Sequence, residues 1–199
     1  MNALAPHILS SRPSRTATPP LIPAEGVELA TGRAHEICGP ARRYLALLAA
    51  AACQGPVFWI APSWCRVTPH PPGFSRWLDP GRITFVTPTR TEDVLWSLEE
   101  TLRAGIVPLV VADLPTPPDL TPVRRLHLAA ETGGAETGLP PVALLMTPEG
   151  AAPGIETRWS VTPACEAARP AWKIDRLRDR TKPPASWTVD ATGRALPPA

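Results

Sequence analysis

The turn at Gly39-Pro40 has the residue types that bind phosphate in many α/β proteins, a glycine between a predicted strand and a predicted helix. A phosphate loop of the form GxxxxGK followed by Ser or Thr, starting at Gly39, would need Gly, Lys and a hydroxyl residue at positions 44, 45 and 46. The chain has Tyr44, Leu45 and Ala46 there. Because no lysine or hydroxyl is placed to contact a γ-phosphate or Mg²⁺, the sequence predicts a degenerate phosphate loop without ATPase activity.

Two arginines, Arg42 and Arg43, open the predicted helix after this turn. The N-terminus of a helix carries a partial positive charge, so cations there are unfavourable unless an anion lies close by. One interpretation is that both side chains bind a phosphate or the carboxylate of a partner. The other interpretation is that both side chains are simply solvated.

Further along the chain, Arg124 and Arg125 lie on the polar face of a predicted helix, opposite Val123 and Leu126. A solvated helix surface accounts for these two arginines, and so does a patch that binds a protein partner. The sequence alone leaves both interpretations open.

Trp64 lies in a proline-rich connection over residues 62–80. It is either an exposed anchor for a protein partner or a side chain that holds the connection in place. Trp59 and Trp96, in a predicted strand and a predicted helix, are expected to be buried. No set of Cys and His residues has the spacing of a complete metal site, so we expect no metal and no other cofactor.

The densest basic cluster lies near the C-terminus, where Trp172 and Trp187 flank it. Basic grooves with aromatic platforms bind single-stranded nucleic acid, so this cluster predicts weak, salt-dependent contact with DNA. The basic residues are Lys173, Arg176, Arg178, Arg180 and Lys182.

The elements that must position these residues follow an alternating order. Continuous apolar segments, typical of strands buried on both faces, alternate with helical segments that follow an apolar or amphipathic pattern. The strands are predicted at 33–38, 57–61, 82–86, 106–112 and 142–146, and the helices at 44–53, 91–104 and from Thr121 to just before Gly133-Gly134. This order predicts an α/β fold with a mostly parallel sheet flanked by helices. Half-polar segments at 157–161, 172–177 and 186–189 predict antiparallel strands at its C-terminal edge.

Composition bounds the class of protein. The chain has 199 residues, 44% of them hydrophobic, and a net charge of +2, so a folded domain is expected rather than a disordered chain. Its 28 prolines exclude a simple helical bundle. We expect a flexible Pro/Ser/Arg-rich arm over residues 1–25, one domain over 26–190 and a flexible tail over 191–199. The longest apolar run is too short to span a bilayer and no signal peptide pattern is present, so a cytoplasmic location is expected.

Several segments carry a family resemblance. GRAHEICGP at 32–40, followed by the Leu/Ala-rich helix, resembles the RecA core at its phosphate loop, and residues 91–113 resemble the RecA helix and strand that end in the Walker B aspartate, here Asp113. VFWIAPSW at 57–64, AGIVPLVVAD at 104–113 and LTPVRRLHL at 120–128 resemble the ImuA family, which is related to RecA and to the SulA division inhibitors. The resemblance covers about residues 26–190.

The resemblance implies a RecA-like domain with a part in DNA damage tolerance. ImuA proteins accompany an ImuB-type polymerase-like protein and an error-prone polymerase in the SOS-induced mutagenesis cassette. Pro62-Ser63-Trp64 stands where RecA-like ATPases have a water-activating glutamate. We therefore expect a non-catalytic adaptor in translesion DNA synthesis that contacts an ImuB-type protein, with RecA as a further candidate partner and no membrane partner. The alternatives are a divergent nucleotide-binding ATPase that uses Asp113, and a SulA-like cell-division inhibitor.

Overall fold

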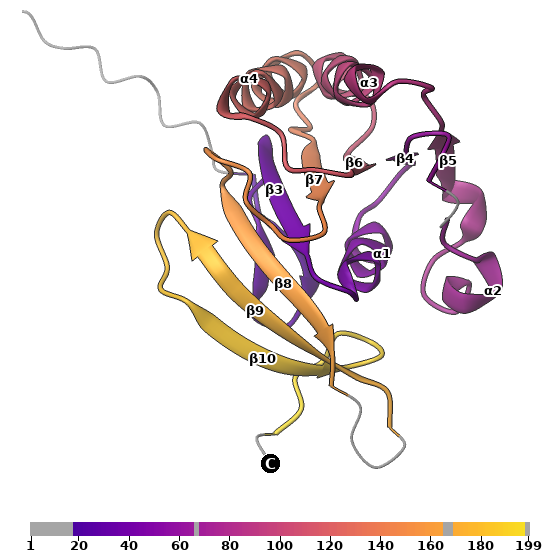
Figure 1. Ribbon diagram of the computed structural model, residues 1–199, viewed down its shortest axis with the longest axis vertical. Coiled ribbons are helices and arrows are strands. Elements are labelled where there is room, and N and C mark those ends of the chain that lie inside the picture. The colour runs from indigo at the N-terminus through magenta and orange to yellow at the C-terminus, as the bar shows by residue number, and fades with distance from the viewer. Residues whose placement is uncertain (1–17, 66–67, 165–168, 198–199) are drawn as a thin grey trace, which may run out of the picture.

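Eight strands form one sheet at the centre of the computed structural model, which describes residues 18–65, 68–164 and 169–197 (Figure 1). The strands lie in the order β10-β9-β8-β3-β7-β6-β4-β5. The six strands from β8 to β5 are parallel, and β9 and β10 continue the sheet as an antiparallel edge. Their bounds are β3 Arg33–Cys38, β4 Val57–Ile60, β5 Ile83–Val86, β6 Leu109–Asp113, β7 Val142–Met146, β8 Thr157–Pro163, β9 Ala171–Asp179 and β10 Ala185–Asp190.

Helices cover both faces of the parallel strands. The helix α1 (Arg42–Ala52) lies on one face, and α3 (Thr91–Ala104) and α4 (Leu120–Thr137) pack side by side on the other (Figure 1). In the described part of the proline-rich connection between β4 and β5, the helical elements are the short helix α2 (Pro71–Phe74) and a 3₁₀ turn at Pro80–Arg82. The predicted α/β fold, a mostly parallel sheet flanked by helices, is confirmed, and so are antiparallel strands at its C-terminal edge, β9 and β10. The prediction that the segment at 157–161 is also antiparallel was wrong in part, because β8 pairs with β3 in the parallel direction and is antiparallel only to β9. Within the described ranges, no helix is both long and apolar enough to cross a membrane.

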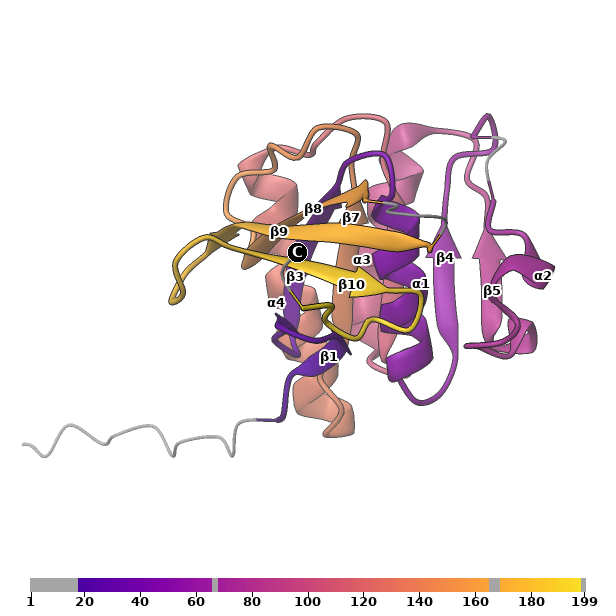
Figure 2. The ribbon, with the colours of Figure 1, turned by 90° about the horizontal axis from the view of Figure 1, so that it is seen from below.

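The core has one layer on each face of the sheet. On the side of α3 and α4, side chains such as Leu98 and Leu126 pack against the parallel strands. On the side of α1, buried side chains of the helix share one core layer with side chains of β8, β9 and β10, the strands labelled in front of the helix in Figure 2. There the ring of Tyr44 in α1 stacks on Trp172 in β9, with ring centroids 3.9 Å apart and an interplanar angle of 7°. Trp59 is fully buried in this layer, as predicted.

The helix α4 extends past the glycine pair that was predicted to stop it. It ends at Thr137, followed by Gly138 in the left-handed conformation. Gly133 and Gly134 are buried inside the helix because the backbones of neighbouring segments lie against them. A Cβ at Gly133 would lie 2.8 Å from the Cα of Gly105, and closer still to the carbonyl oxygen of Leu102. The glycines therefore permit close helix packing instead of ending the helix.

The prediction that Trp96 is buried was wrong. Its side chain lies on α3 and is 61% exposed. The buried stripe of α3 consists of Val94, Leu98, Glu99 and Leu102. Position 96 lies two residues, and so roughly half a turn, away from that stripe on either side. Hydrophobic character alone did not indicate which face Trp96 would occupy.

Both ends of the described chain pack on the domain. Within the predicted arm, β1 (Leu21–Ala24) pairs with β2 (Val27–Leu29) in a two-stranded antiparallel sheet. In the predicted tail, Leu196 N–H donates to the carbonyl of Thr188, and Ala195 N–H donates to Glu25. Regular contacts therefore begin before residue 26 and continue beyond residue 190, while the predicted arm over 1–17 lies outside the described residues.

We predict that Gly133→Ala destabilises the domain by about 2 kcal/mol, because the clash with α3 outweighs the better helix propensity of alanine. Chemical denaturation measures this change. Gly73→Ala, at a position with no neighbouring atom within 4 Å, is the matched control and should change the free energy of unfolding by less than about 0.5 kcal/mol. Equal stability of the two variants would contradict the packing argument.

Candidate functional site

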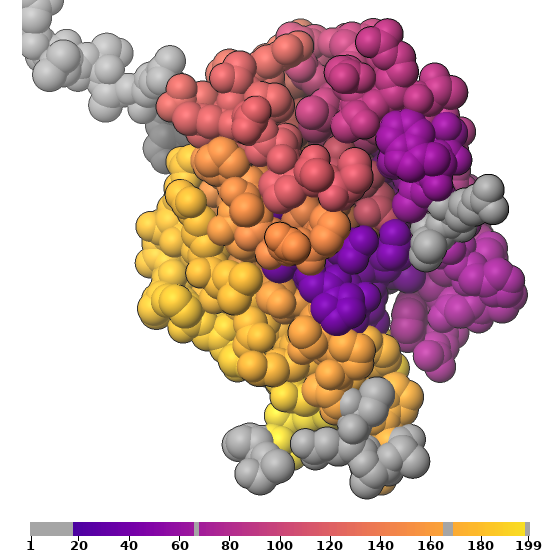
Figure 3. Space-filling view, viewed as in Figure 1, coloured from indigo at the N-terminus to yellow at the C-terminus, as the bar shows by residue number. Residues whose placement is uncertain are grey.

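The turn between β3 and α1 lies at the carboxyl edge of the parallel strands, where α/β proteins bind ligands. Gly39 has φ +89°, and a Cβ there would lie 2.6 Å from the carbonyl oxygen of Val161, so only glycine fits. In the space-filling view, indigo atoms from this early part of the chain reach the surface between orange atoms of the C-terminal half and magenta atoms (Figure 3). The predicted degenerate phosphate loop is thus at the surface.

Most backbone N–H groups of this turn form hydrogen bonds with carbonyl groups of the same chain. A phosphate loop binds its ligand through free N–H groups that point into the turn. Here Pro40 has no N–H, and the neighbouring amides donate to carbonyl oxygens of the same chain. The bonds are Gly39 N–H to Pro148 (3.1 Å), Ala41 N–H to Val161 (3.0 Å), Arg42 N–H to Gly39 (3.3 Å) and Tyr44 N–H to Ala41 (2.9 Å). The turn in this conformation therefore offers few donors to a phosphate.

The structure brings Arg42, Arg43 and Asp113 together, although the sequence separates them by about seventy residues. Asp113 ends β6 and is 4% exposed. Arg43 forms an ion pair and hydrogen bond with its carboxylate, and Arg42 Nη2 lies 3.7 Å from Oδ1. Of the two interpretations of Arg42 and Arg43, the structure shows neither fully solvated side chains nor an external anion, because the carboxylate beside them belongs to the chain itself. Asp113, the aspartate predicted to be Walker B-like, is ion-paired with these cations.

This charge cluster is not fully hydrogen-bonded. Arg42 Nη1 donates to the carbonyl of Gly39 at 3.2 Å, but the Nε atoms of Arg42 and Arg43 are buried and have no acceptor among the described residues. The thiol of Cys65 lies 4.0 Å from both Arg43 Nη2 and Asp113 Oδ2. Within the described ranges, no three His, Cys, Asp or Glu side chains come together as a set that could hold a metal ion.

Glu36 on β3 is a residue whose role the sequence analysis did not identify. Its carboxylate is fully buried and accepts hydrogen bonds from Thr147 Oγ1 (2.7 Å), Arg158 Nε (2.5 Å) and the amides of Ala151 and Ala152. These contacts fix the segment 147–152 beside the turn. A carboxylate within an otherwise buried strand was the signal that could have indicated this role.

The two arginines on α4 differ in environment. Arg125 Nη2 lies 2.7 Å from Glu99 Oε2 and so links α4 to α3. Arg124 is exposed and forms no ion pair or hydrogen bond with any described residue. Trp64 follows β4 and is 51% exposed. Arg124, Arg125 and Trp64 are therefore all exposed, and Arg125 in addition links α4 to α3.

The five C-terminal basic residues do not form one free surface. Arg176 is buried between the rings of Trp159 and Trp187, with its guanidinium carbon 5.8 Å and 5.2 Å from their centroids. Three others face acidic partners, and Arg178 is exposed. Those pairs are Lys173 with Asp175 (3.1 Å), Arg180 with Glu156 (3.5 Å) and Lys182 with Glu28 (2.6 Å). Direct contact with DNA through this cluster stays a prediction.

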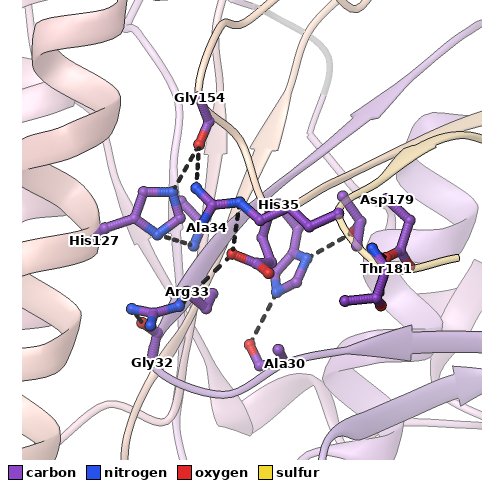
Figure 4. A network of polar contacts seen from close by, with 12 residues as sticks. Ala30, Gly32, Arg33, Ala34, His35, His127, Gly154, Asp179 and Thr181 are labelled. Atoms are coloured by element: carbon purple, nitrogen blue, oxygen red, sulfur yellow. Dashed lines mark hydrogen bonds and ion pairs between the residues drawn. The ribbon is translucent and has the colours of Figure 1, made fainter.

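A buried histidine lies beside this C-terminal region (Figure 4). His35 on β3 contacts Thr157 Oγ1 at 2.7 Å and the carbonyl oxygen of Ala30 at 2.9 Å. Burial lowers the pKa of His35 from 6.5 to about 4, because the charged imidazolium would be desolvated. The side chain is therefore neutral in the folded protein at neutral pH.

Comparison with known proteins gives no matching family model and no matching curated protein. The fold and the geometry at the β3–α1 turn therefore carry the functional argument.

We predict that Asp113→Asn lowers the free energy of unfolding by about 2 kcal/mol, because it leaves two half-buried guanidinium groups without a counter-charge. Urea denaturation measures the loss. Glu92→Gln, which removes an ion pair with Arg90 at the surface, is the control and should cost less than about 0.5 kcal/mol. An unchanged midpoint for Asp113→Asn would show that the arginines do not depend on this carboxylate.

Acid should destabilise the protein through His35. In the unfolded chain this residue takes up a proton below about pH 6.5, whereas in the folded chain it does so only near pH 4. The contribution of neutral His35 to the free energy of unfolding is therefore fully present above pH 6.5 and is lost as the pH falls toward 4. The expected loss is roughly 3 kcal/mol. The pKa of His127 is also lowered by burial, which adds to the loss. Denaturation curves recorded at several pH values between 4 and 6.5 give the free energy of unfolding as a function of pH. This free energy should fall less steeply toward low pH for His35→Gln than for wild type. An equal pH dependence in the two proteins would contradict the role given to His35.

Proposed function

We propose that this chain is a RecA-like, ImuA-type adaptor that acts in the cytoplasm during SOS-induced translesion DNA synthesis and does not hydrolyse nucleotide. In this role it contacts an ImuB-type polymerase-like protein, with RecA as a further candidate partner. The observation that supports the proposal is that the polar groups of the β3–α1 turn are bonded to other groups of the same chain. The amides of the turn donate to the chain's own carbonyl groups, and Arg42 and Arg43 face the chain's own Asp113.

The sheet topology supports this proposal. The strands β3 and β6, which end at the turn and at Asp113, are parallel to each other and separated only by β7. A nucleotide-binding ancestor would have its phosphate loop and its Walker B aspartate at this same edge. The arrangement is what we expect of a RecA-like scaffold in which internal contacts have replaced nucleotide contacts, since a fold can be retained when its activity is lost.

The edge next to β5 is the surface we propose for the partner. The strand β5 pairs with β4, and among the described strands it has no neighbour on its other side. Phe85 on β5 is 41% exposed, and Ser63 N–H donates to the carbonyl of Pro88 at 2.8 Å, which places the segment before Trp64 beside the chain that follows β5. An open edge strand with exposed aromatic side chains nearby suits β-strand addition by a partner.

Affinity capture of the tagged protein from damaged and undamaged cells, followed by mass spectrometry, tests the proposal. We expect recovery of an ImuB-type subunit after damage, and loss of at least about 80% of it with Trp64→Ala, because hot-spot tryptophans contribute a large part of interface affinity. Trp96→Ala, which removes an exposed tryptophan from α3, is the matched control and should retain the partner.

A second measurement separates the adaptor from a nucleotide-binding enzyme. Calorimetric titration of the purified chain with MgATP should show no binding at millimolar concentration. Saturable binding that Asp113→Asn abolishes would favour the divergent ATPase. Recovery of cell-division proteins instead of polymerase subunits would favour a SulA-like inhibitor.

A further inference from the structure

A second surface feature lies along the outer flank of α4. There an open groove of about 430 Å³ separates the helix from β3, the segment before β8 and the turn after β9. Leu120, Arg124 and Leu128 line one wall at successive helical turns, and Arg33 and Arg180 lie on the other. We call this feature the α4 groove. It lies apart from the β3–α1 turn and from the β5 edge.

The charges in the α4 groove leave one cation without a partner. Arg33 forms an ion pair with Glu131 and lies 3.7 Å from Glu156, and Arg180 lies 3.5 Å from Glu156. Arg124 has no acidic partner or hydrogen bond among the described residues. Three guanidinium groups thus face two carboxylates, and the surplus positive charge is on Arg124. An anionic group of a ligand would complete this arrangement.

Hydrogen bonds hold the walls of the α4 groove together, and Figure 4 shows those made by His127 and Gly154. His127 Nδ1 accepts a hydrogen bond from Ala34 N–H at 3.3 Å, so in the neutral ring the proton is on Nε2, which lies 3.2 Å from the carbonyl oxygen of Gly154. Arg180 also donates to that carbonyl at 3.5 Å. These contacts join α4 to β3 and to the segment before β8, so the walls of the groove need little further ordering when a ligand binds.

The apolar surface beside Arg124 indicates which class of anionic ligand fits the α4 groove. Leu120 and Leu128 lie one helical turn to either side of Arg124 and are 37% and 62% exposed. A free phosphate would leave both leucines in water. A nucleic-acid strand carries several phosphates, whereas Arg33 and Arg180 are already paired with Glu131 and Glu156 and only Arg124 is left for an anion. A peptide with one carboxylate and apolar side chains on either side matches all three positions.

We propose that the α4 groove binds an acidic, leucine-bearing segment of a protein partner, with its carboxylate on Arg124 and its apolar side chains on Leu120 and Leu128. This inference rests on the proposed adaptor function, because the segment belongs to a protein that the chain recruits. The α4 groove would be a second contact site, with a cation in a groove beside a helix, whereas the β5 edge offers open backbone groups of a strand.

The test uses the full chain and a defined peptide. The probe is an acetylated and amidated peptide with aspartate at its centre and leucine four residues to either side, the remaining residues being serine and alanine. NMR titration should shift the amide signals of α4 and of residues 150–156. Arg124→Glu should weaken binding by about tenfold or more, and binding should also weaken as salt is raised. Arg178→Glu, the same charge change at an exposed arginine outside the groove lining, should change affinity less than about twofold.

Two outcomes would overturn the inference. One is equal binding of a peptide with lysine in place of aspartate, and the other is absence of binding at millimolar peptide. Arg124→Glu should melt as wild type does, because Arg124 has no partner to lose, so loss of binding would not reflect unfolding. Preferential binding of a single-stranded oligonucleotide to the same signals would also contradict the proposal.

Affinity capture with the same variant separates this inference from the proposed function. If Arg124→Glu still recovers the ImuB-type subunit and the peptide does not bind, the groove proposal fails and the adaptor function stands. If the peptide binds through Arg124 and no polymerase subunit is recovered from damaged cells, the groove stands and the adaptor function in translesion synthesis fails.

Discussion

Enclosure of α1 is the constraint on which the rest of the structure depends. The helix packs against the parallel strands and against β1, and the ring of Tyr44 stacks on Trp172 in β9. The N-terminus of the helix is thereby held against the end of β6. Two arginines in that enclosed position need a counter-charge, since buried cations are costly when unpaired, and Asp113 supplies it.

This internal pairing has a functional consequence. A turn that holds a nucleotide must keep its amides and cations free until the ligand arrives. In this chain the amides donate to nearby carbonyl groups and the guanidinium groups face Asp113. The same contacts that stabilise the domain therefore oppose nucleotide binding, and they suit a scaffold whose proposed role is to bind other proteins.

Two surfaces of different chemistry suit such a role. The edge beside β5 offers open backbone groups near the exposed side chains of Phe85 and Trp64. The α4 groove offers a cation, Arg124, between two exposed leucines. An adaptor with two separate surfaces can hold two partners, or two segments of one partner, and gains avidity if both bind together.

Local pattern determined most of the elements of this protein. Apolar runs and helical spacing were enough to predict five of the six parallel strands, three main helices and the strands of the C-terminal edge, because these signals depend on neighbours within a few residues. They did not give the direction of β8, which is parallel to β3, because strand direction depends on which strand lies beside it. The sequence also singled out Arg42 and Arg43, as cations at a helix N-terminus, and Asp113, for its resemblance to a Walker B aspartate. It did not place the exposed face of Trp96 or the continuation of α4 through Gly133, since both depend on which helix packs beside which.

Tertiary structure alone decided which charges meet. Asp113 neutralises the arginines of α1 because only β7 separates β6 from β3 in the sheet, and no local signal encodes that order. Glu36 meets Arg158 because β8 pairs with β3. Arg176 on β9 is covered because the strands on either side, β8 and β10, bring Trp159 and Trp187 around it. The sequence determined where charges and aromatic rings stand along the chain. Only the folded sheet decided which of them are satisfied internally and which, like Arg124, remain free to bind a partner, because electrostatic contacts depend on distance in space.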